Sequence, residues 1–206
     1  ACRESFKNFF SQPTFQAVED KIEVVYPAMH FEDRGKRESP VVPAFIYVSR
    51  DFYWKCGRET LAAFDAVSKK YDAKLYFVSN TPPEFKAKYA SNKTIEFFES
   101  PIPREQVFEL YRKSTAFVFP TLVDVFGLVL LEAMSFELPA IASNMFAIPE
   151  IIADNENGLL VEPEYTLYQK IFLRAFYETP AFLVFVKSHY QPVLEKQLSE
   201  KMIWVI

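Results

Sequence analysis

Residues 117–132 constrain the fold more than any other stretch of the chain. Their sequence is FVFPTLVDVFGLVLLE. The apolar, β-branched and aromatic run stops at Pro120, and Gly127 precedes LVLLEAM, whose apolar residues recur with the period of a helix. This order predicts a buried strand, a turn and a helix.

The same alternation of strand-like and helix-like segments extends from residue 44 to residue 161. The predicted strands are residues 45–48, 75–78, 94–98, 116–119, 139–143 and 158–161. Helices are predicted at 59–71, after Pro83, from Pro103, at 128–134 and at 148–152. Strands separated by helices predict a parallel sheet with helices on both faces, and so a Rossmann-like α/β domain.

Three regions follow from this pattern. Residues 1–43 are expected to hold a short helix, a strand at KIEVVYP and a charged, proline-bounded linker. Residues 44–179 hold the Rossmann-like domain. Residues 180–206 are predicted to form a helical tail, with breaks at Pro180 and Pro192.

Composition excludes several classes of protein. With 206 residues, half of them hydrophobic, the chain can bury one substantial core. The net charge of −4 and the lack of a basic tract argue against a general nucleic-acid-binding protein. Cys2 and Cys56 have no metal or redox spacing, which indicates a reducing compartment, and no apolar run has membrane-spanning length. We therefore expect a cytoplasmic protein, with peripheral membrane association of a full-length enzyme left open.

The start of the chain suggests a larger parent protein. It begins ACRESF, with neither an initiator Met nor a signal peptide. We expect the sequence to be a piece of something longer.

Polar residues gather in the loops that follow the predicted strands. In open parallel sheets, ligands bind outside the carboxyl ends of the strands. The loops at that edge hold Arg50, Lys55, Ser79, Asn80, Glu99, Ser100, Asp124 and residues 143–150. This edge is the expected ligand site.

Two carboxylates, Asp124 and Glu132, lie eight residues apart on the turn and the helix of the central stretch. In continuous helix they would be about 12 Å apart along the axis, too far for a shared metal ion or proton. Beside a helix N-terminus, which attracts anions, such a pair suits a long ligand made of a sugar, a diphosphate and a ribose. Without the surrounding motif, Asp124 and Glu132 are better explained as a loop carboxylate and a helix-surface glutamate. Solvated loop charges are the alternative for Arg50 and Lys55, whose spacing and position on the ligand edge favour binding.

Three spaced motifs resemble the C-terminal, nucleotide-sugar-binding half of GT-B glycosyltransferases of family 4, the group 1 retaining enzymes. A paired acidic motif appears as DVFGLVLLE, from Asp124 to Glu132. An arginine with a lysine five residues later, before a helix, appears in SRDFYWKCGRETLAAF. A proline–glutamate turn and a glycine-led strand appear as IPEIIADNENGLLVEP. Their order over about three quarters of the chain is specific, although each motif alone is weak.

The resemblance implies roles for individual residues. Arg50 and Lys55 would clamp the donor diphosphate and stabilise the leaving group. Asp124 would contact hydroxyls of the transferred sugar, and Glu132 would hold the ribose. The clamp and the sugar contact make Arg50, Lys55 and Asp124 the expected catalytic residues.

The donor site implied by the family extends to the neighbouring loops. Backbone amides of Phe126, Gly127 and Leu128 would face phosphate or sugar oxygens, and Glu150 would shape a loop beside the donor. The departing phosphate would act as the base, so no cofactor or metal is expected beyond a substrate such as a UDP- or GDP-hexose. The choice between these bases stays open. Acceptor contacts would come from an N-terminal domain that the chain does not include, so we expect little or no transfer by the chain alone.

Several positions depart from the family pattern. Asp124 is one methylene shorter than the usual glutamate, and Ser49 and Cys56 stand where glycines flank the clamp. Phe146 and Ala147 replace a glycine pair, which narrows a loop that brings backbone close to phosphate. These departures keep a second hypothesis open, a non-catalytic nucleotide-sugar-binding or interaction module with the same fold. A nucleotide-sugar epimerase is a weaker third, because no acid–base residues can be placed.

Overall fold

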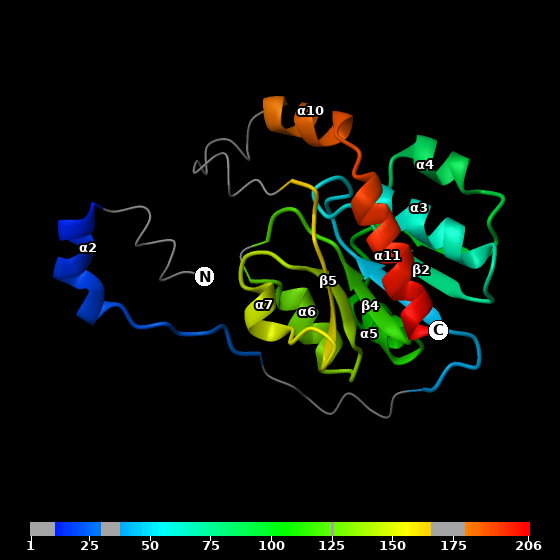
Figure 1. Cartoon of the computed structure of the whole chain (residues 1–206). Helices are drawn as coiled ribbons and strands as arrows, with labels where there is room; N and C mark the ends of the chain where they lie inside the picture. Colours follow the sequence, from blue (N-terminus) through cyan, green and yellow to red (C-terminus); the bar gives the residue numbers. More distant parts are fainter. Residues whose placement is uncertain (1–10, 30–37, 125, 166–179) are drawn as a thin grey trace. The chain divides into compact units, whose positions relative to one another are not determined.

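The computed structural model describes residues 11–29, 38–124, 126–165 and 180–206 (Figure 1). Contacts divide the chain into two units, Ala1–Glu32 and Asp33–Ile206. Within the first unit, α2 spans Gln12–Val18 and a 3₁₀ turn, η1, spans Glu19–Lys21. The helix expected at SFKNFF lies outside the described residues.

The strand predicted at KIEVVYP is wrong. Residues 22–29 form neither helix nor strand, and Val25 is 82% exposed. Alternating apolar residues fit a strand only where a neighbouring strand accepts their backbone hydrogen bonds. In the described part of the chain, this segment has no such partner.

The second unit is built on a six-stranded parallel sheet of order β3-β2-β1-β4-β5-β6. Its strands are β1 Ala44–Val48, β2 Lys74–Val78, β3 Ile95–Phe98, β4 Ala116–Phe119, β5 Ala140–Ser143 and β6 Gly158–Val161. Each of the six strands predicted between residues 44 and 161 is confirmed, with ends shifted by at most one residue. The signal is clear because central parallel strands are buried on both faces and are therefore almost wholly apolar.

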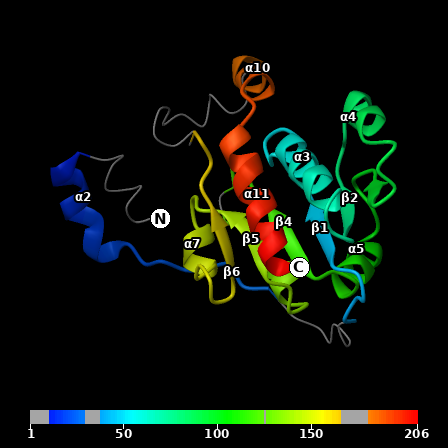
Figure 2. The same cartoon turned by 45° about the vertical axis from the view of Figure 1, so that its right-hand side comes forward.

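Helices cover both faces of this sheet (Figure 2). They are α3 Gly57–Ser68, α4 Pro83–Lys88, α5 Arg104–Arg112, α6 Leu128–Met134, α7 Ile148–Ile151, α10 Pro180–Ser188 and α11 Pro192–Val205. One core cluster joins α3 and α11 to the sheet, and the other joins α5, α6 and α7 to its opposite face. The predicted Rossmann-like α/β fold is confirmed.

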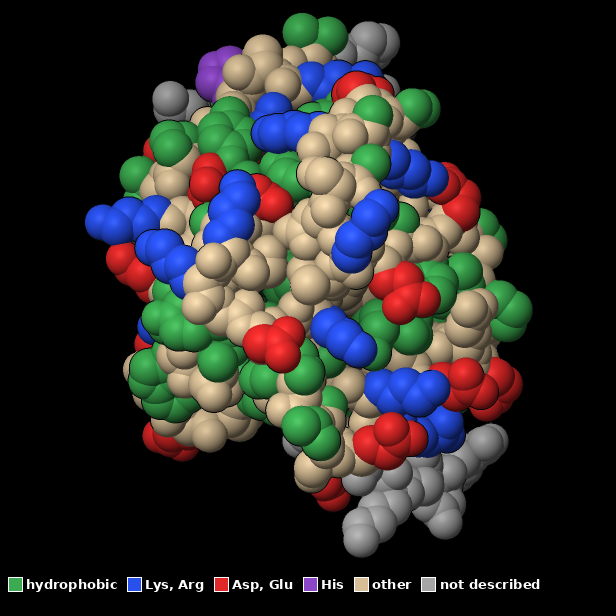
Figure 3. All heavy atoms as spheres, turned by 90° about the vertical axis from the view of Figure 1, so that its right-hand side faces the viewer, with side chains coloured by type: hydrophobic (Ala, Val, Ile, Leu, Met, Phe, Trp, Pro, Cys, Tyr) green, Lys and Arg blue, Asp and Glu red, His purple; other side chains and the backbone are tan. Residues whose placement is uncertain are grey.

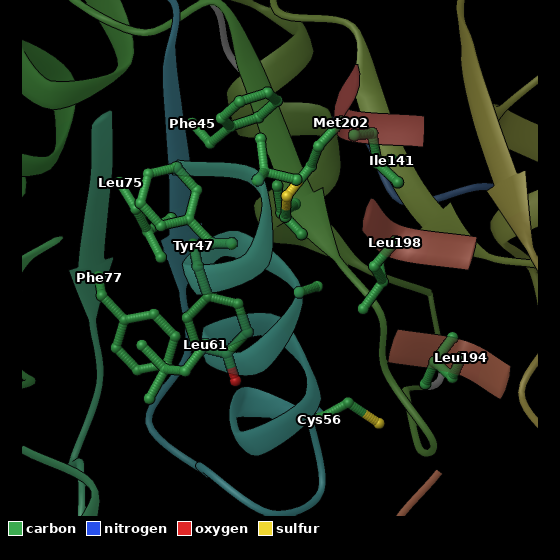
Figure 4. Packing of buried hydrophobic residues seen from close by; sticks show 14 of the residues in the cluster. Phe45, Tyr47, Cys56, Leu61, Leu75, Phe77, Ile141, Leu194, Leu198 and Met202 are labelled. Atoms are coloured by element: carbon green, nitrogen blue, oxygen red, sulfur yellow. The ribbon is translucent and has the colours of Figure 1, made fainter. Parts of the chain in front are cut away.

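Side chains of β1 alternate between the two core clusters. Phe45 and Tyr47 face α3 and α11, whereas Ile46 belongs to the opposite cluster. The ring of Tyr47 stacks on that of Phe77 in β2, with centroids 4.4 Å apart (Figure 4). This period of two makes β1 the centre of both cores.

The C-terminal helices are confirmed as helices, but α11 is not a separate tail. Leu194, Leu198 and Met202 follow one another at intervals of four residues, and all are 0% exposed. They pack with Ile141 and with the α3 side of the sheet (Figure 4). The stripe is buried because side chains four residues apart lie on one helix face.

The surface carries charges of both signs, as expected from a chain with 23 Lys and Arg and 27 Asp and Glu residues. On the side shown in Figure 3, basic and acidic side chains are interspersed with apolar ones. No described helix combines the length and apolar character needed to cross a bilayer.

The position of α11 predicts the effect of shortening its buried side chains. Leu198→Ala should lower the free energy of unfolding by about 2–5 kcal/mol, because a buried side chain is replaced by a cavity. Val193→Ala, on the same helix at a side chain 51% exposed, should change it by less than about 1 kcal/mol. Urea denaturation of both variants measures the difference. Equal effects would mean that α11 does not contribute to the core.

Candidate functional site

In an open α/β sheet, the ligand crevice lies at the carboxyl edge, between two neighbouring strands that lead to opposite faces. β1 continues into α3 on one face, and the neighbouring β4 continues into α6 on the other. A reversal of this kind separates the loops after the two strands, and ligands of open α/β sheets bind there. The loops are joined where the Leu122 amide donates to the carbonyl of Trp54 over 2.9 Å.

Lys55 and Asp124 meet in this crevice. Lys55 Nζ donates to Asp124 Oδ2 and to the carbonyl of Val123, each at 2.5 Å. It also lies 5.2 Å from the centre of the Phe119 ring. The two charged side chains are 15% and 22% exposed, so the pair is largely shielded but open on one side. Two residues predicted to contact one donor are therefore adjacent.

The second oxygen of Asp124 binds the loop before α6. Asp124 Oδ1 accepts hydrogen bonds from the amides of Phe126, at 3.1 Å, and Gly127, at 2.6 Å. Gly127 has φ +83°, a left-handed conformation that suits glycine. Two of the amides expected to face donor oxygens thus bind a carboxylate of the chain itself. The positive end of the helix explains why an anion is held there.

Glu132 lies on α6 beside a cation that the motifs do not include. Its Oε1 accepts from Arg104 Nε at 3.3 Å and Nη2 at 3.2 Å. The Glu132 side chain is 18% exposed and that of Arg104 is 63% exposed. Burial, together with the nearby Glu132 carboxylate, raises the pKa of the Tyr111 hydroxyl well above its ordinary value. Arg104 was missed because its partner is 28 residues away.

Arg50 and Glu150 both have exposed side chains. Arg50 is exposed after β1, and among the described residues its side chain forms no ion pair. Glu150 is exposed in the first turn of α7. The side chain of Leu128 is also exposed, at 52%.

Two residues that stand where the family pattern has glycine adopt a backbone conformation typical of glycine. Cys56 and Phe146 both have φ +52°, a left-handed conformation rare for residues with a side chain. Ser49 differs, because its Oγ accepts from the amide of Asp51 at 3.0 Å and so builds the turn after β1. Burial raises the pKa of the Cys56 thiol well above its usual range, which keeps it protonated. The backbone geometry of a glycine is retained at two sites without the glycine.

Metal-binding geometry is not found in the described ranges. Within them, no group of three or more His, Cys, Asp or Glu residues is placed to hold a metal ion. The described histidine, His189, bonds instead through Nδ1 to the carbonyl of Phe185 at 2.8 Å.

Comparison with known proteins gives a family match. The family model described as glycosyl transferases group 1 matches residues 30–171. A curated relative, O-antigen chain mannosyltransferase B of Escherichia coli, is 39% identical over 62 residues, which are 30% of this chain and 16% of the relative. The matched stretch is therefore a small part of that protein's length.

Solved structures share the fold. The C-terminal domain of a glycosyl transferase group 1 family protein, LpcC from Francisella tularensis, superposes with a TM-score of 0.53 and 23% identity. The match covers 87% of this chain and 92% of that domain. Anabaena Alr3699/HepE in complex with UDP-glucose gives a TM-score of 0.51 at 13% identity, over 80% of this chain and 46% of that one.

The contacts of Asp124 predict different effects for two substitutions. Asp124→Ala removes the acceptor for two loop amides and should lower the free energy of unfolding by about 1–2 kcal/mol. Asp124→Asn retains an acceptor and loses mainly a partly exposed ion pair, which should cost about 0.5 kcal/mol. Equilibrium urea denaturation distinguishes the two. If both variants lose the same amount, the acceptor at residue 124 does not stabilise the loop.

Proposed function

The chain belongs to the group 1 glycosyl transferase family, and we propose that it is the donor-binding half of a retaining GT-B enzyme. The enzyme would transfer a hexose from a nucleotide diphosphate sugar. The observation that carries the proposal is the meeting of Lys55 with Asp124 at the carboxyl edge of the sheet. Glu132 lies on the helix that begins immediately after this loop.

The two clamp cations would neutralise the diphosphate. Arg50 is exposed beside the crevice, and Lys55 has three ammonium protons, two of which are used on Val123 and Asp124. A diphosphate attracts both cations, and the same contacts stabilise the negative charge that grows on the leaving group. Departing phosphate would then take the acceptor proton, as the family resemblance implies, so these residues need not supply a base.

Glu132 and Asp124 would contact the two hydroxyl-rich ends of the donor. An ionised carboxylate only accepts hydrogen bonds, so it binds the protons of sugar hydroxyls and leaves their oxygen lone pairs available to other donors. Glu132 would hold the ribose, for which Arg104 must share or release Oε1. Asp124 would reach the transferred sugar only by loosening its contacts with Lys55 or the loop amides. The fold shared with the UDP-glucose complex of HepE supports a nucleotide-sugar donor.

The acceptor side is assigned to a second domain. Curated relatives extend far beyond the matched stretch, which covers 16% of the mannosyltransferase. We propose that an N-terminal domain completes the cleft and that the chain alone binds donor but transfers little sugar. No cofactor or metal is assigned a role.

A second function is supported by the ion pair and hydrogen bonds that the loop residues form with one another. Asp124 takes up Lys55 and two amides, and Phe146 stands in a left-handed position of the neighbouring loop. A module that kept the fold for binding or interaction, without catalysis, would tolerate such a closed arrangement. If neither this chain nor the chain joined to its proposed N-terminal domain binds a nucleotide, the interaction module is favoured.

Titration with nucleotides tests the proposal. UDP, GDP, ADP and their hexose conjugates are titrated into the chain by calorimetry and thermal shift. A ligand at 100 times its dissociation constant should stabilise the fold by about 2.7 kcal/mol. Glu132→Ala and Arg50→Ala should each weaken binding at least about tenfold with little change in melting temperature, because one charged contact is lost.

A matched variant controls for general effects of charge. Glu109→Ala removes an exposed carboxylate from α5, on the same face of the sheet, and should leave binding unchanged. Binding that survives Glu132→Ala would contradict the assigned ribose site. Robust sugar transfer by the chain alone would contradict the two-domain requirement.

A further inference from the structure

Gln191 is a fully buried amide between α10 and α11, far in sequence from the clamp. Its Nε2 donates to the Sγ of Cys56 at 3.4 Å, across 135 residues. Its Oε1 accepts from the amide of Glu164, beyond β6, at 3.0 Å. Its backbone amide donates to Glu59 Oε1 at 3.3 Å. One residue therefore connects the end of β6, the start of α3 and residues 49–56, the loop between β1 and α3 that we call the clamp loop.

Cys56 is the residue through which Gln191 reaches the clamp. It follows Lys55 directly and holds a left-handed conformation that its side chain disfavours. Such a conformation persists only where neighbouring contacts fix it. Figure 4 shows Cys56 at the base of α3, on the side that faces α11. The Gln191 contact is one of those that hold this backbone in place.

The next residue adds a close steric fit. A Cβ on Gly57 would lie 2.6 Å from Cδ2 of Phe52, within the same loop. The loop is therefore packed against its own exit into α3. The Gly57 amide also donates to the carbonyl of Phe52 at 2.8 Å, so the backbone on the far side of Cys56 is held as well.

Arg58 and Glu59, in the first turn of α3, form further contacts with the residues around Gln191. Arg58 donates through Nη1 to the carbonyl of Lys187 at 2.7 Å and through Nη2 to that of His189 at 2.9 Å. Arg58 Nη2 also binds Glu59 Oε1 at 2.8 Å. Residues 187–191 are thus attached to the first turn of α3 by charged and amide groups that are mostly shielded from water.

The positions of the Lys55 carbonyl and of the Lys55 side chain both depend on the backbone conformation of Cys56. Its carbonyl accepts from the hydroxyl of Tyr47 at 3.1 Å, and its Nζ must reach Val123 and Asp124. A rotation at Cys56 would displace that carbonyl and redirect the side chain.

We propose that Gln191 is a positioning residue that holds the clamp loop, through Cys56, in the conformation that presents Lys55 to the donor. The inference rests on the proposed function, in which Lys55 binds the diphosphate. The ligand is the nucleoside diphosphate itself, so its affinity reports the position of the clamp.

A matched pair of variants tests this inference. Gln191→Leu keeps the side-chain volume and removes the contacts to Cys56 and Glu164. Gln197→Leu removes a similar bridge from α11, in which the Gln197 side chain accepts from Glu162 N at 2.7 Å and donates to Glu162 O at 3.1 Å. Titration uses the nucleoside diphosphate that binds wild type, well below the melting temperature of each variant. Gln191→Leu should weaken binding about five- to tenfold, and Gln197→Leu by less than about twofold.

A second substitution provides a rescue that a merely structural role of Gln191 would not give. Glycine adopts the left-handed conformation without a steric penalty. Cys56→Gly combined with Gln191→Leu should therefore recover most of the lost affinity. Equal affinities of the Gln191→Leu and Gln197→Leu proteins, or a double variant no better than Gln191→Leu, would overturn the inference.

A measurement without ligand separates the inference from the proposed function. Trp204→Phe leaves Trp54, in the clamp loop, as the single tryptophan. In that background, acrylamide quenching of Trp54 should rise with Gln191→Leu and stay unchanged with Gln197→Leu. Unchanged quenching in both would overturn the positioning role. If quenching rises as expected but wild type binds no nucleotide, the loop is positioned by Gln191 and the donor-binding function is wrong.

Discussion

The pairing of β1 with β4 is the contact on which the rest of the structure depends. Phe45 lies opposite Ala116, and Ile46 opposite Phe117, so two three-stranded halves become one sheet. The pairing extends at its start, where the amide of Ala44 donates to Thr115 Oγ1. Because the chain leaves these two strands toward opposite faces, their following loops meet across a single crevice. Both the double core and the site are consequences of this junction.

The carboxylates Asp124 and Glu132 are each paired with a cation of the chain itself. Asp124 binds Lys55 with one oxygen and two amides with the other, and Glu132 binds Arg104. A partly shielded carboxylate is costly without such partners. The pairs therefore stabilise these loops. In the proposed function, a donor would exchange the contacts of Asp124 and Glu132, whereas Arg50 and the third ammonium proton of Lys55 would bind it directly. Affinity then depends on how much stronger the new contacts are than the old.

The local pattern of the sequence predicted most of the fold and part of the site. Apolar runs located every strand because these strands are buried on both faces. Motif spacing brought Lys55 and Asp124 to one edge, since both follow neighbouring strands. Contacts between distant segments left no local signal, as with Arg104 and Glu132, or Gln191 and Cys56, which are 135 residues apart. At KIEVVYP the local pattern was misleading instead, because the apolar residues alternate as in a strand but no neighbouring strand pairs with them in the described part of the chain.

The burial of α11 against α3 has a consequence for how the chain is made. Synthesis proceeds from the N-terminus, and the strands and α3 emerge well before Leu194, Leu198 and Met202. Among the described residues, the opposite core, closed by α5, α6 and α7, draws on residues up to 160. One side of the sheet can therefore be complete while the other still exposes Phe45 and Leu61 to water. A nascent chain in that state offers an apolar surface to chaperones, and to other unfinished copies of itself.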